Sequence, residues 1–178
     1  GTIGIVTGGP ELGLRGTWRG FQWPLRGNAP AVTSPGGEFS LGGRWPFDLQ
    51  ASGRIKPADL PEFPAQMRGS LAKDRVVVRE GSAALWGGKA SVAGEAQWAP
   101  EYRWGFKGHV AELDVAQLRA DVPGRIGFDF AASGNRFAGD TDLDLRFDKL
   151  AGRLRGAAAR GGGHVQRTDS LWHFDNVA

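Results

Sequence analysis

Apolar and polar side chains alternate along much of this chain with a period of two residues. Such alternation places successive side chains on opposite faces of a β-strand, one apolar and one solvated. The apolar members of the clearest runs are Trp45, Phe47, Leu49 and Ala51; Tyr102, Trp104, Phe106 and Val110; Ile126, Phe128 and Phe130; and Leu143, Leu145 and Phe147. Each run predicts a strand with one apolar face.

Short clusters of turn-forming residues separate these runs. They are 34–37 (SPGG), 73–74 (KD), 99–101 (APE), 134–135 (GN) and 168–170 (TDS). Because short connections join antiparallel neighbours, the sequence predicts about a dozen strands in a meander. The segment 112–120 is the one candidate for a helical turn, with Asp114 as its cap and Pro123 beyond its end.

The composition favours an all-β fold that is rich in glycine. The 178 residues include 29 Gly and 10 Pro, which disfavours helix bundles and doubly wound α/β folds. The 7 Trp and 10 Phe supply more apolar bulk than a disordered glycine-rich tract carries. Rings interleaved with Gly and Ala are typical of an open, curved sheet, in which small residues bend the strands and rings line a concave surface.

Net charge and cysteine content exclude only a few classes of function. The chain has 22 basic and 19 acidic residues, and a net charge of +3 is weak evidence for a polyanion partner. Arg-Gly dipeptides begin at Arg15, Arg19, Arg26, Arg68, Arg155 and Arg160. They punctuate apolar strands, whereas nucleic-acid-binding Arg-Gly arms are disordered, so we predict no nucleic-acid partner. The absence of Cys excludes disulfides and thiolate metal sites.

The sequence contains only incomplete forms of known metal-binding motifs. The histidines, none with the spacing typical of metal ligands, are His109, His164 and His173. Asp140, Asp142 and Asp144 imitate the start of an EF-hand loop, but Leu145 stands where that loop needs glycine. We therefore interpret the three aspartates as the solvated face of a strand and predict no metal site.

Catalytic patterns are equally incomplete. Residues 70–73 (SLAK) match the S-x-x-K pattern of acyl-serine enzymes, which needs the lysine one helical turn after the serine. Here the pattern runs into a predicted hairpin turn, and its partner motifs are missing. No phosphate-binding glycine loop of the P-loop or dinucleotide type is found either. The sequence predicts that the protein is not an enzyme and takes no cofactor.

Several short motifs combine aromatic rings, glycines and strand-like alternation in a distinctive way. They are 13–25 (GLRGTWRGFQWPL), 36–41 (GGEFSL), 47–53 (FDLQASG), 94–100 (GEAQWAP), 113–115 (LDV) and 122–124 (VPG). Over most of residues 13–134 the chain thereby resembles the family of translocation and assembly module subunit TamB, which are AsmA-like bacterial envelope proteins.

The resemblance implies a long periplasmic protein, anchored in the inner membrane and folded as a repeating antiparallel β-groove, or β-taco, with an apolar concave side. It implies roles in outer-membrane protein assembly with a barrel partner, TamA, and in carrying phospholipids between the two membranes. Residues 1–178 are then expected to be one internal segment of the groove. The membrane anchor and the TamA contacts are expected in other parts of the protein.

The residues predicted to contact phospholipid acyl chains share one parity of the alternating runs. They are Trp45, Phe47, Leu49, Ala90, Val92, Trp104, Phe106, Val110, Phe128, Phe130, Leu143, Leu145 and Phe147. Hydrophobicity alone assigns this parity to the groove. Two alternatives stay open: a small closed β-barrel, either of the outer-membrane or of the lipocalin-like kind, and a structural β module without a ligand.

Overall fold

The computed structural model describes residues 2–7, 12–23, 30–135, 142–168 and 171–175. These residues form twelve β-strands and one 3₁₀ turn, which confirms the predicted dozen strands. The strands are β1 (Thr2–Thr7), β2 (Leu12–Trp23), β3 (Val32–Gly43), β4 (Phe47–Pro57), β5 (Phe63–Leu71), β6 (Arg75–Leu85), β7 (Gly88–Gln97), β8 (Arg103–Asp114), β9 (Gly124–Gly134), β10 (Leu143–Leu154), β11 (Ala157–Thr168) and β12 (Leu171–Asp175), and the 3₁₀ turn is η1 (Val115–Gln117).

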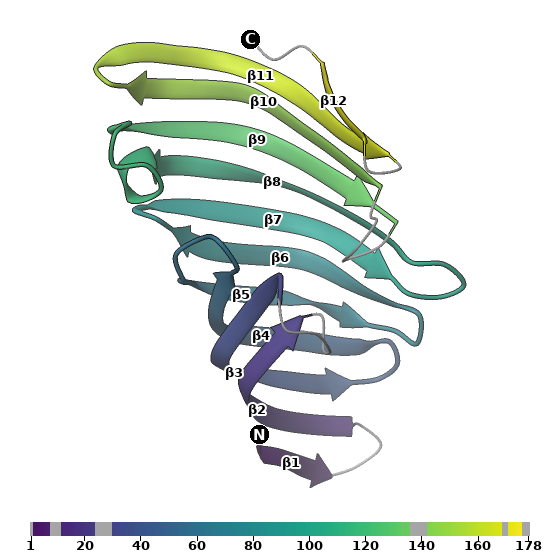
Figure 1. The fold of residues 1–178 in the computed structure, drawn as a ribbon. Helices are drawn as coiled ribbons and strands as arrows, with labels where there is room; N and C mark the ends of the chain where they lie inside the picture. The colour runs from purple at the N-terminus through teal and green to yellow at the C-terminus, as the bar shows by residue number, and fades with distance from the viewer. Residues whose placement is uncertain (1, 8–11, 24–29, 136–141, 169–170, 176–178) are drawn as a thin grey trace.

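All twelve strands belong to one antiparallel sheet whose strand order is the order of the chain (Figure 1). Each strand pairs with the strand before it and the strand after it, as the short connections predict. β1 and β12 each have one paired neighbour, so the described strands form an open meander and not the closed barrel that the sequence left as an alternative. The predicted all-β fold, an antiparallel meander in one open sheet, is confirmed.

The open sheet leaves an unusually large surface in contact with solvent. The accessible surface is 11655 Å² for a chain of 19.0 kDa. A compact monomer of that mass exposes about 8,400 Å². The excess is expected for a single layer, because neither a helix nor a second sheet covers either face of the described strands.

The pairing register gathers the apolar side chains of successive strands on one side, which we call the apolar face; the other side is the polar face. Leu41 of β3 pairs with Leu49 of β4, for example, and Val110 of β8 with Phe128 of β9. The larger members of the apolar face are Leu14 and Trp18 (β2), Phe39 and Leu41 (β3), Phe47, Leu49 and Ile55 (β4), Phe63, Met67 and Leu71 (β5), Val76, Val78 and Leu85 (β6), Val92 (β7), Trp104, Phe106, Val110 and Leu113 (β8), Ile126, Phe128 and Phe130 (β9), Leu143, Leu145, Phe147, Leu150 and Leu154 (β10), Val165 and Arg167 (β11), and Trp172 and Phe174 (β12).

β-Bulges keep this face continuous while the strands bend. The register shifts by one residue in β6 over Val78–Gly81, in β8 over Val110–Leu113 and in β10 over Phe147–Leu150. Glu112 and Lys149, inside two of these bulges, have φ values of 56° and 53°. A bulge bends its strand and increases the local twist. After each bulge the apolar positions change from even to odd numbering, or the reverse, and still point to the same side.

Bulky side chains on the apolar face lie over glycines of the neighbouring strand. Phe130 of β9 pairs with Gly108 of β8, and Phe147 of β10 pairs with Gly163 of β11. A Cβ atom on Gly108 would stand 2.7 Å from two ring carbons of Phe130, and one on Gly163 would stand 2.5 Å from Cζ of Phe147. The rings therefore occupy the volume that a side chain would need, an arrangement that stabilises glycine-containing sheets.

At the other end of the sheet, one tryptophan covers two glycines. A Cβ atom on Gly37 or Gly53 would meet Cζ2 of Trp18 at 2.1 or 2.7 Å. Nε1 of Trp18 donates a hydrogen bond of 2.8 Å to Oγ of Ser34, whose residue is 1% exposed. This bond satisfies the indole N–H and the serine hydroxyl on the apolar face, where neither has ready access to water.

Two of the predicted turns are confirmed, and one is wrong. Residues 73–74 connect β5 to β6, and residues 99–101 connect β7 to β8. Residues 34–37 instead lie inside β3, where the register with β4 shifts between Thr33 and Gly37. A proline is tolerated in a sheet at such an irregularity, and Gly37 is needed there to make room for the Trp18 ring. Of the residues singled out from the sequence, Arg26, Asp140, Asp169 and Ser170 lie outside the described residues.

The predicted helical turn over 112–120 is shorter than expected. β8 continues through Asp114, and only Val115–Gln117 form a 3₁₀ turn. Asp114 caps this turn as predicted, because its Oδ1 accepts a hydrogen bond of 3.1 Å from the backbone N–H of Ala116. The bulge in β8 carries the strand through Glu112 to Asp114, so the first three residues of the predicted turn belong to the strand.

Gly108→Ala is expected to lower the free energy of unfolding by about 1–3 kcal/mol, because the new methyl group would overlap the Phe130 ring and the carbonyl oxygen of Ser91. Gly105→Ala is the matched control on the same strand, since its Cβ would have no neighbour closer than 3.9 Å. That control should be neutral or slightly stabilising. Urea unfolding followed by circular dichroism measures both, and equal effects of the two substitutions would contradict the ring-over-glycine packing.

Ser34→Ala is expected to cost about 1–3 kcal/mol of stability, because it leaves the indole N–H of Trp18 without its acceptor. Ser91→Ala, an exposed serine on the polar face of β7, serves as the control and should change stability little. Urea midpoints of the two variants give the comparison. A Ser34→Ala protein as stable as the parent would show that water replaces the serine at Trp18.

Candidate functional site: the apolar face

Twelve of the thirteen residues predicted to line a groove stand on the apolar face. Ten of them come from four consecutive strands and form one patch: Ala90 and Val92 (β7), Trp104, Phe106 and Val110 (β8), Phe128 and Phe130 (β9), and Leu143, Leu145 and Phe147 (β10). Phe47 and Leu49 lie on β4, separated from the patch by β5 and β6. The structure thus brings most of the predicted set together.

The patch is held by direct cross-strand pairs. Val110 pairs with Ala90 on one side and with Phe128 on the other, and it is only 4% exposed. The rings of Trp104 and Phe106 lie next to each other along β8, with centroids 6.2 Å apart. Because these contacts are between side chains on strands that are already paired, they order the rings without a second layer.

Trp45 is the predicted residue that stands apart. It precedes β4, in the bend after β3, and it is 56% exposed. Its ring meets Phe47 edge to face, with centroids 5.2 Å apart. Alternation counted back from Phe47 assigned Trp45 to the same strand, but β4 begins only at Phe47. Trp45 therefore lies at the edge of the apolar face and not on its floor.

Sequence reasoning missed the middle of the face. Met67 of β5 and Val78 of β6 belong to it, and Val78 is 8% exposed. The signal was obscured by the run Val76 to Val78, in which Val77 points to the polar face, and by the bulge that follows. The apolar positions of this strand have even numbers up to Val78 and odd numbers from Gly81 onward. This change could have been detected in the sequence.

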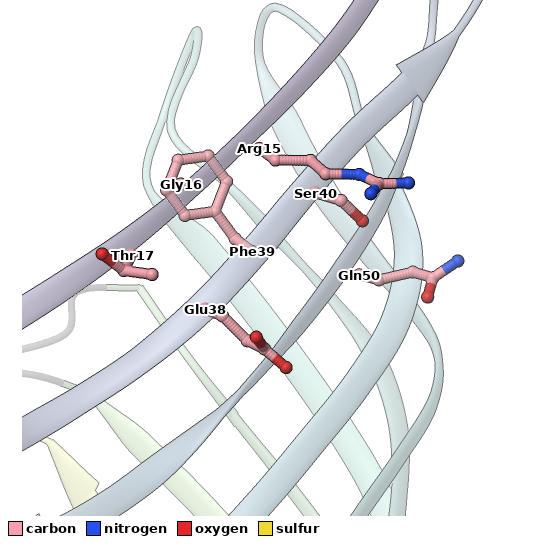
Figure 2. Close-up of a pocket in the computed structure, with 7 residues that line it drawn as sticks. All are labelled: Arg15, Gly16, Thr17, Glu38, Phe39, Ser40 and Gln50. Carbon is pink, nitrogen blue, oxygen red and sulfur yellow. The ribbon is translucent and has the colours of Figure 1, made fainter. Parts of the chain in front are cut away.

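The polar face is shallowly hollowed between its side chains. One such hollow has a volume of about 470 Å³. In Figure 2, Arg15, Ser40 and Gln50 of its lining point to one side of the strands and Phe39 points to the other. A second hollow of about 560 Å³ includes Lys107 among its lining residues. Exposed charged side chains border both hollows, Arg15 in the first and Lys107 in the second.

Ion pairs cross the strands of the polar face. Asp129 of β9 lies 2.8 Å from Nζ of Lys149 and 2.7 Å from Nδ1 of His109, on the two neighbouring strands. Lys149 first, and His109 after it, hold the pKa of Asp129 below its usual range. Gln166 and His164 likewise hold the pKa of Asp144 down by hydrogen bonding its carboxylate. These carboxylates stay ionised and already have partners, as expected of a solvated structural face.

Ser70 of the S-x-x-K pattern and Asp144 of the EF-hand-like pattern lie on strands β5 and β10. Ser70 lies in β5 and Lys73 in the hairpin after it, so no helical turn brings the lysine to the serine. Among the residues that the structure describes, no group of three or more His, Cys, Asp or Glu side chains is placed to hold a metal ion. None of the helical segments in the described ranges has the length and apolar character needed to cross a membrane.

The amino-acid sequence matches one known protein family. The family model described as "TamB, N-terminal domain" matches residues 7–178, which is nearly the whole chain. No curated protein and no solved structure matched. The match extends through the C-terminal strands, where the motif likeness thins, and the open antiparallel meander agrees with the fold that the likeness implied. The chain belongs to the TamB family and corresponds to its N-terminal domain.

Proposed function

We propose that this chain is a periplasmic β-groove segment whose apolar face conducts phospholipid acyl chains between the inner and outer membranes and supports outer-membrane protein assembly. The observation that carries the proposal is one apolar face that continues from strand to strand across the sheet with no layer covering it. Most side chains of the patch on β7 to β10 are half-buried and keep part of their apolar surface in contact with water. A contiguous apolar surface of this kind marks a binding surface when it is retained.

The burial pattern supports a sheet that bends toward its apolar face. Among the residues whose burial the structure describes, the buried apolar ones are Val78, Ala96, Val110 and Leu113, and all four are on that face. With no second layer present, such side chains lose contact with water only where neighbours on the same face close over them. A sheet curved toward that face brings its side chains together in this way, and the bulges in β6, β8 and β10 supply the bend.

An open face suits transport better than storage. Each methylene that leaves water gains about 0.8 kcal/mol, and this gain does not depend on where along the face the methylene lies. A continuous apolar surface therefore holds an acyl chain without a single preferred position, so the chain can slide along it. The phospholipid headgroup would stay in solvent at the edge of the sheet.

Family membership supports the envelope part of the proposal. TamB-family proteins belong to the Gram-negative envelope and form a translocation and assembly module with the barrel protein TamA. The present chain would contribute one segment of a longer groove. The inner-membrane anchor and the contacts with TamA would come from other parts of the full-length protein. This role requires no catalysis and no cofactor.

Substituting Phe128 by Asp is expected to reduce bound phospholipid at least ten-fold, because a carboxylate in the middle of the patch makes the apolar face costly for acyl chains. Ala131→Asp adds the same charge to the exposed polar face of the same strand and should leave lipid binding unchanged. Mass spectrometry of lipid extracted from the purified proteins measures the ratio, with circular dichroism to confirm the β-structure.

Photocrosslinking covers the case in which Phe128→Asp fails to fold. A photoreactive phenylalanine analogue is placed at Phe128 in one protein and at Ala131 in another, and each is illuminated with phospholipid vesicles. Crosslinks to lipid at Phe128 and none at Ala131 are expected. A folded protein that carries no lipid and crosslinks at neither position would favour the structural module without a ligand.

A further inference from the structure

The connections between the strands form two rims of the open sheet, and the two rims differ in charge. One rim includes the connections 44–46, 72–74 and 98–102, which join β3 to β4, β5 to β6 and β7 to β8. The opposite rim includes the connections 58–62, 86–87, 115–123 and 155–156. Because consecutive antiparallel strands place alternate connections at opposite ends, the two rims border the apolar face on opposite sides (Figure 1).

The first rim has two cations without a carboxylate partner. Its acidic residues, Asp74 and Glu101, each lie within ion-pair distance of an arginine at the start of the strand that follows. Within the part of the chain that the structure describes, the exposed side chains of Arg44 and Lys73 form neither a hydrogen bond nor an ion pair. Their positive charge is therefore available to an anion, and we call this rim the basic rim.

The opposite rim has no such surplus of positive charge. The cations of its described connections, Arg119 and Arg155, both lie within ion-pair distance of Asp121. Asp59 adds an exposed carboxylate between β4 and β5. An anionic group at this rim would meet arginines that are already paired and a carboxylate that repels it. Charge complementarity therefore favours the basic rim for an anion.

Lys73 stands on a hairpin that is held in place by backbone hydrogen bonds. The backbone N–H of Ala72 donates a bond of 2.8 Å to the carbonyl oxygen of Arg75. Trp98 donates two more, from Nε1 to the carbonyl oxygen of Lys73 at 2.9 Å and from its backbone N–H to that of Asp74 at 2.8 Å. The tryptophan bonds join the hairpin to the next connection along the rim. None of these bonds uses the ammonium group of Lys73.

Aromatic rings join the basic rim to the apolar face. Phe47 and Leu71 form the pair at the end of the β4–β5 ladder, and Trp45 and Lys73 each stand two residues beyond it. The Trp45 ring meets Phe47 edge to face. Tyr102, which directly precedes β8, is 53% exposed. Tryptophan and tyrosine combine an apolar ring with a polar N–H or O–H, and they favour positions where lipid tails meet headgroups.

We propose that the basic rim binds the phosphate groups of phospholipids whose acyl chains lie on the apolar face. Arg44 donates hydrogen bonds to the phosphate oxygens, and Lys73 supplies a second positive charge. Trp45 and Tyr102 lie where the tails meet the headgroup. This inference rests on the proposed function and adds an orientation to it: the headgroups follow the basic rim, and the opposite rim stays free of them.

The first test compares phosphatidic acid with diacylglycerol, each carrying the same fluorescent acyl chain, for binding to the 178-residue chain. We expect the parent protein to prefer phosphatidic acid by about ten-fold, the size of two exposed ion pairs. Arg44→Gln combined with Lys73→Gln should abolish that preference and leave diacylglycerol binding unchanged. The matched control combines Arg68→Gln with Lys107→Gln, which removes two exposed cations from the polar face and should keep the whole preference.

A second test locates the headgroup in the unchanged protein, so it does not depend on the folding of any variant. A phosphatidylethanolamine with a photoreactive group on its ethanolamine is illuminated together with the chain, and the crosslinked peptides are identified by mass spectrometry. Crosslinks within 44–46, 72–74 or 98–102 are expected. Crosslinks within 58–62 or 115–123 at equal or higher yield would overturn the assignment of the headgroups to the basic rim.

The outcomes separate the two proposals. Binding of both lipids with equal affinity, or a preference that survives the loss of Arg44 and Lys73, would overturn the headgroup site and leave lipid transport standing. Binding of neither lipid would overturn the proposed function and the headgroup site with it. Glycerol 3-phosphate is included as a competitor without tails. If it displaces phosphatidic acid at equal concentration, the rim binds free phosphate esters and the assignment to lipid headgroups is wrong.

Discussion

The close approach of bulky side chains to cross-strand glycines is the constraint on which the rest of this sheet depends. A single-layer sheet has no partner layer to receive its apolar side chains, so they must lie down on the sheet itself. Phe130 can do so only because Gly108 leaves its own side-chain volume empty, and Trp18 only because Gly37 and Gly53 do the same. The abundance of 29 glycines in 178 residues thus has a packing function, beyond the turns and flexibility that glycine usually signals.

The bulges solve a second problem, which is to bend long strands without mixing the two faces. Strands β6 to β11 are ten to twelve residues long. If such a strand bent by rotating about its own axis, its apolar side chains would no longer all point to the same face. An extra residue on the polar side, as at Glu112 and Lys149, bends the strand and returns the next apolar residue to the same side. Continuity of the apolar face across β8, β9 and β10 is the result.

The strands and the patch on β7 to β10 were predictable because local alternation there agrees with the final pairing. Positions where non-local contacts decide the outcome were not. Residues 34–37 have every local feature of a turn, yet they lie in β3 because the Trp18 ring needs Gly37 beneath it. Val77 hides the alternation in β6, and Trp45 continues the parity of β4 without belonging to the strand. For residues 34–37 the deciding partner is Trp18, which lies on the neighbouring strand β2 and is distant in the chain.

Arg167 shows why the face of a residue matters more than its type. In the sequence it is one of 22 basic residues and sits in a run of polar side chains, where nothing sets it apart. Only the register with Leu143 and Trp172 places it on the apolar face. A guanidinium is always charged at physiological pH, and holding it there is unfavourable unless an aromatic ring or an anion compensates. The stacked rings of Trp172 and Phe174 on β12 supply part of that compensation.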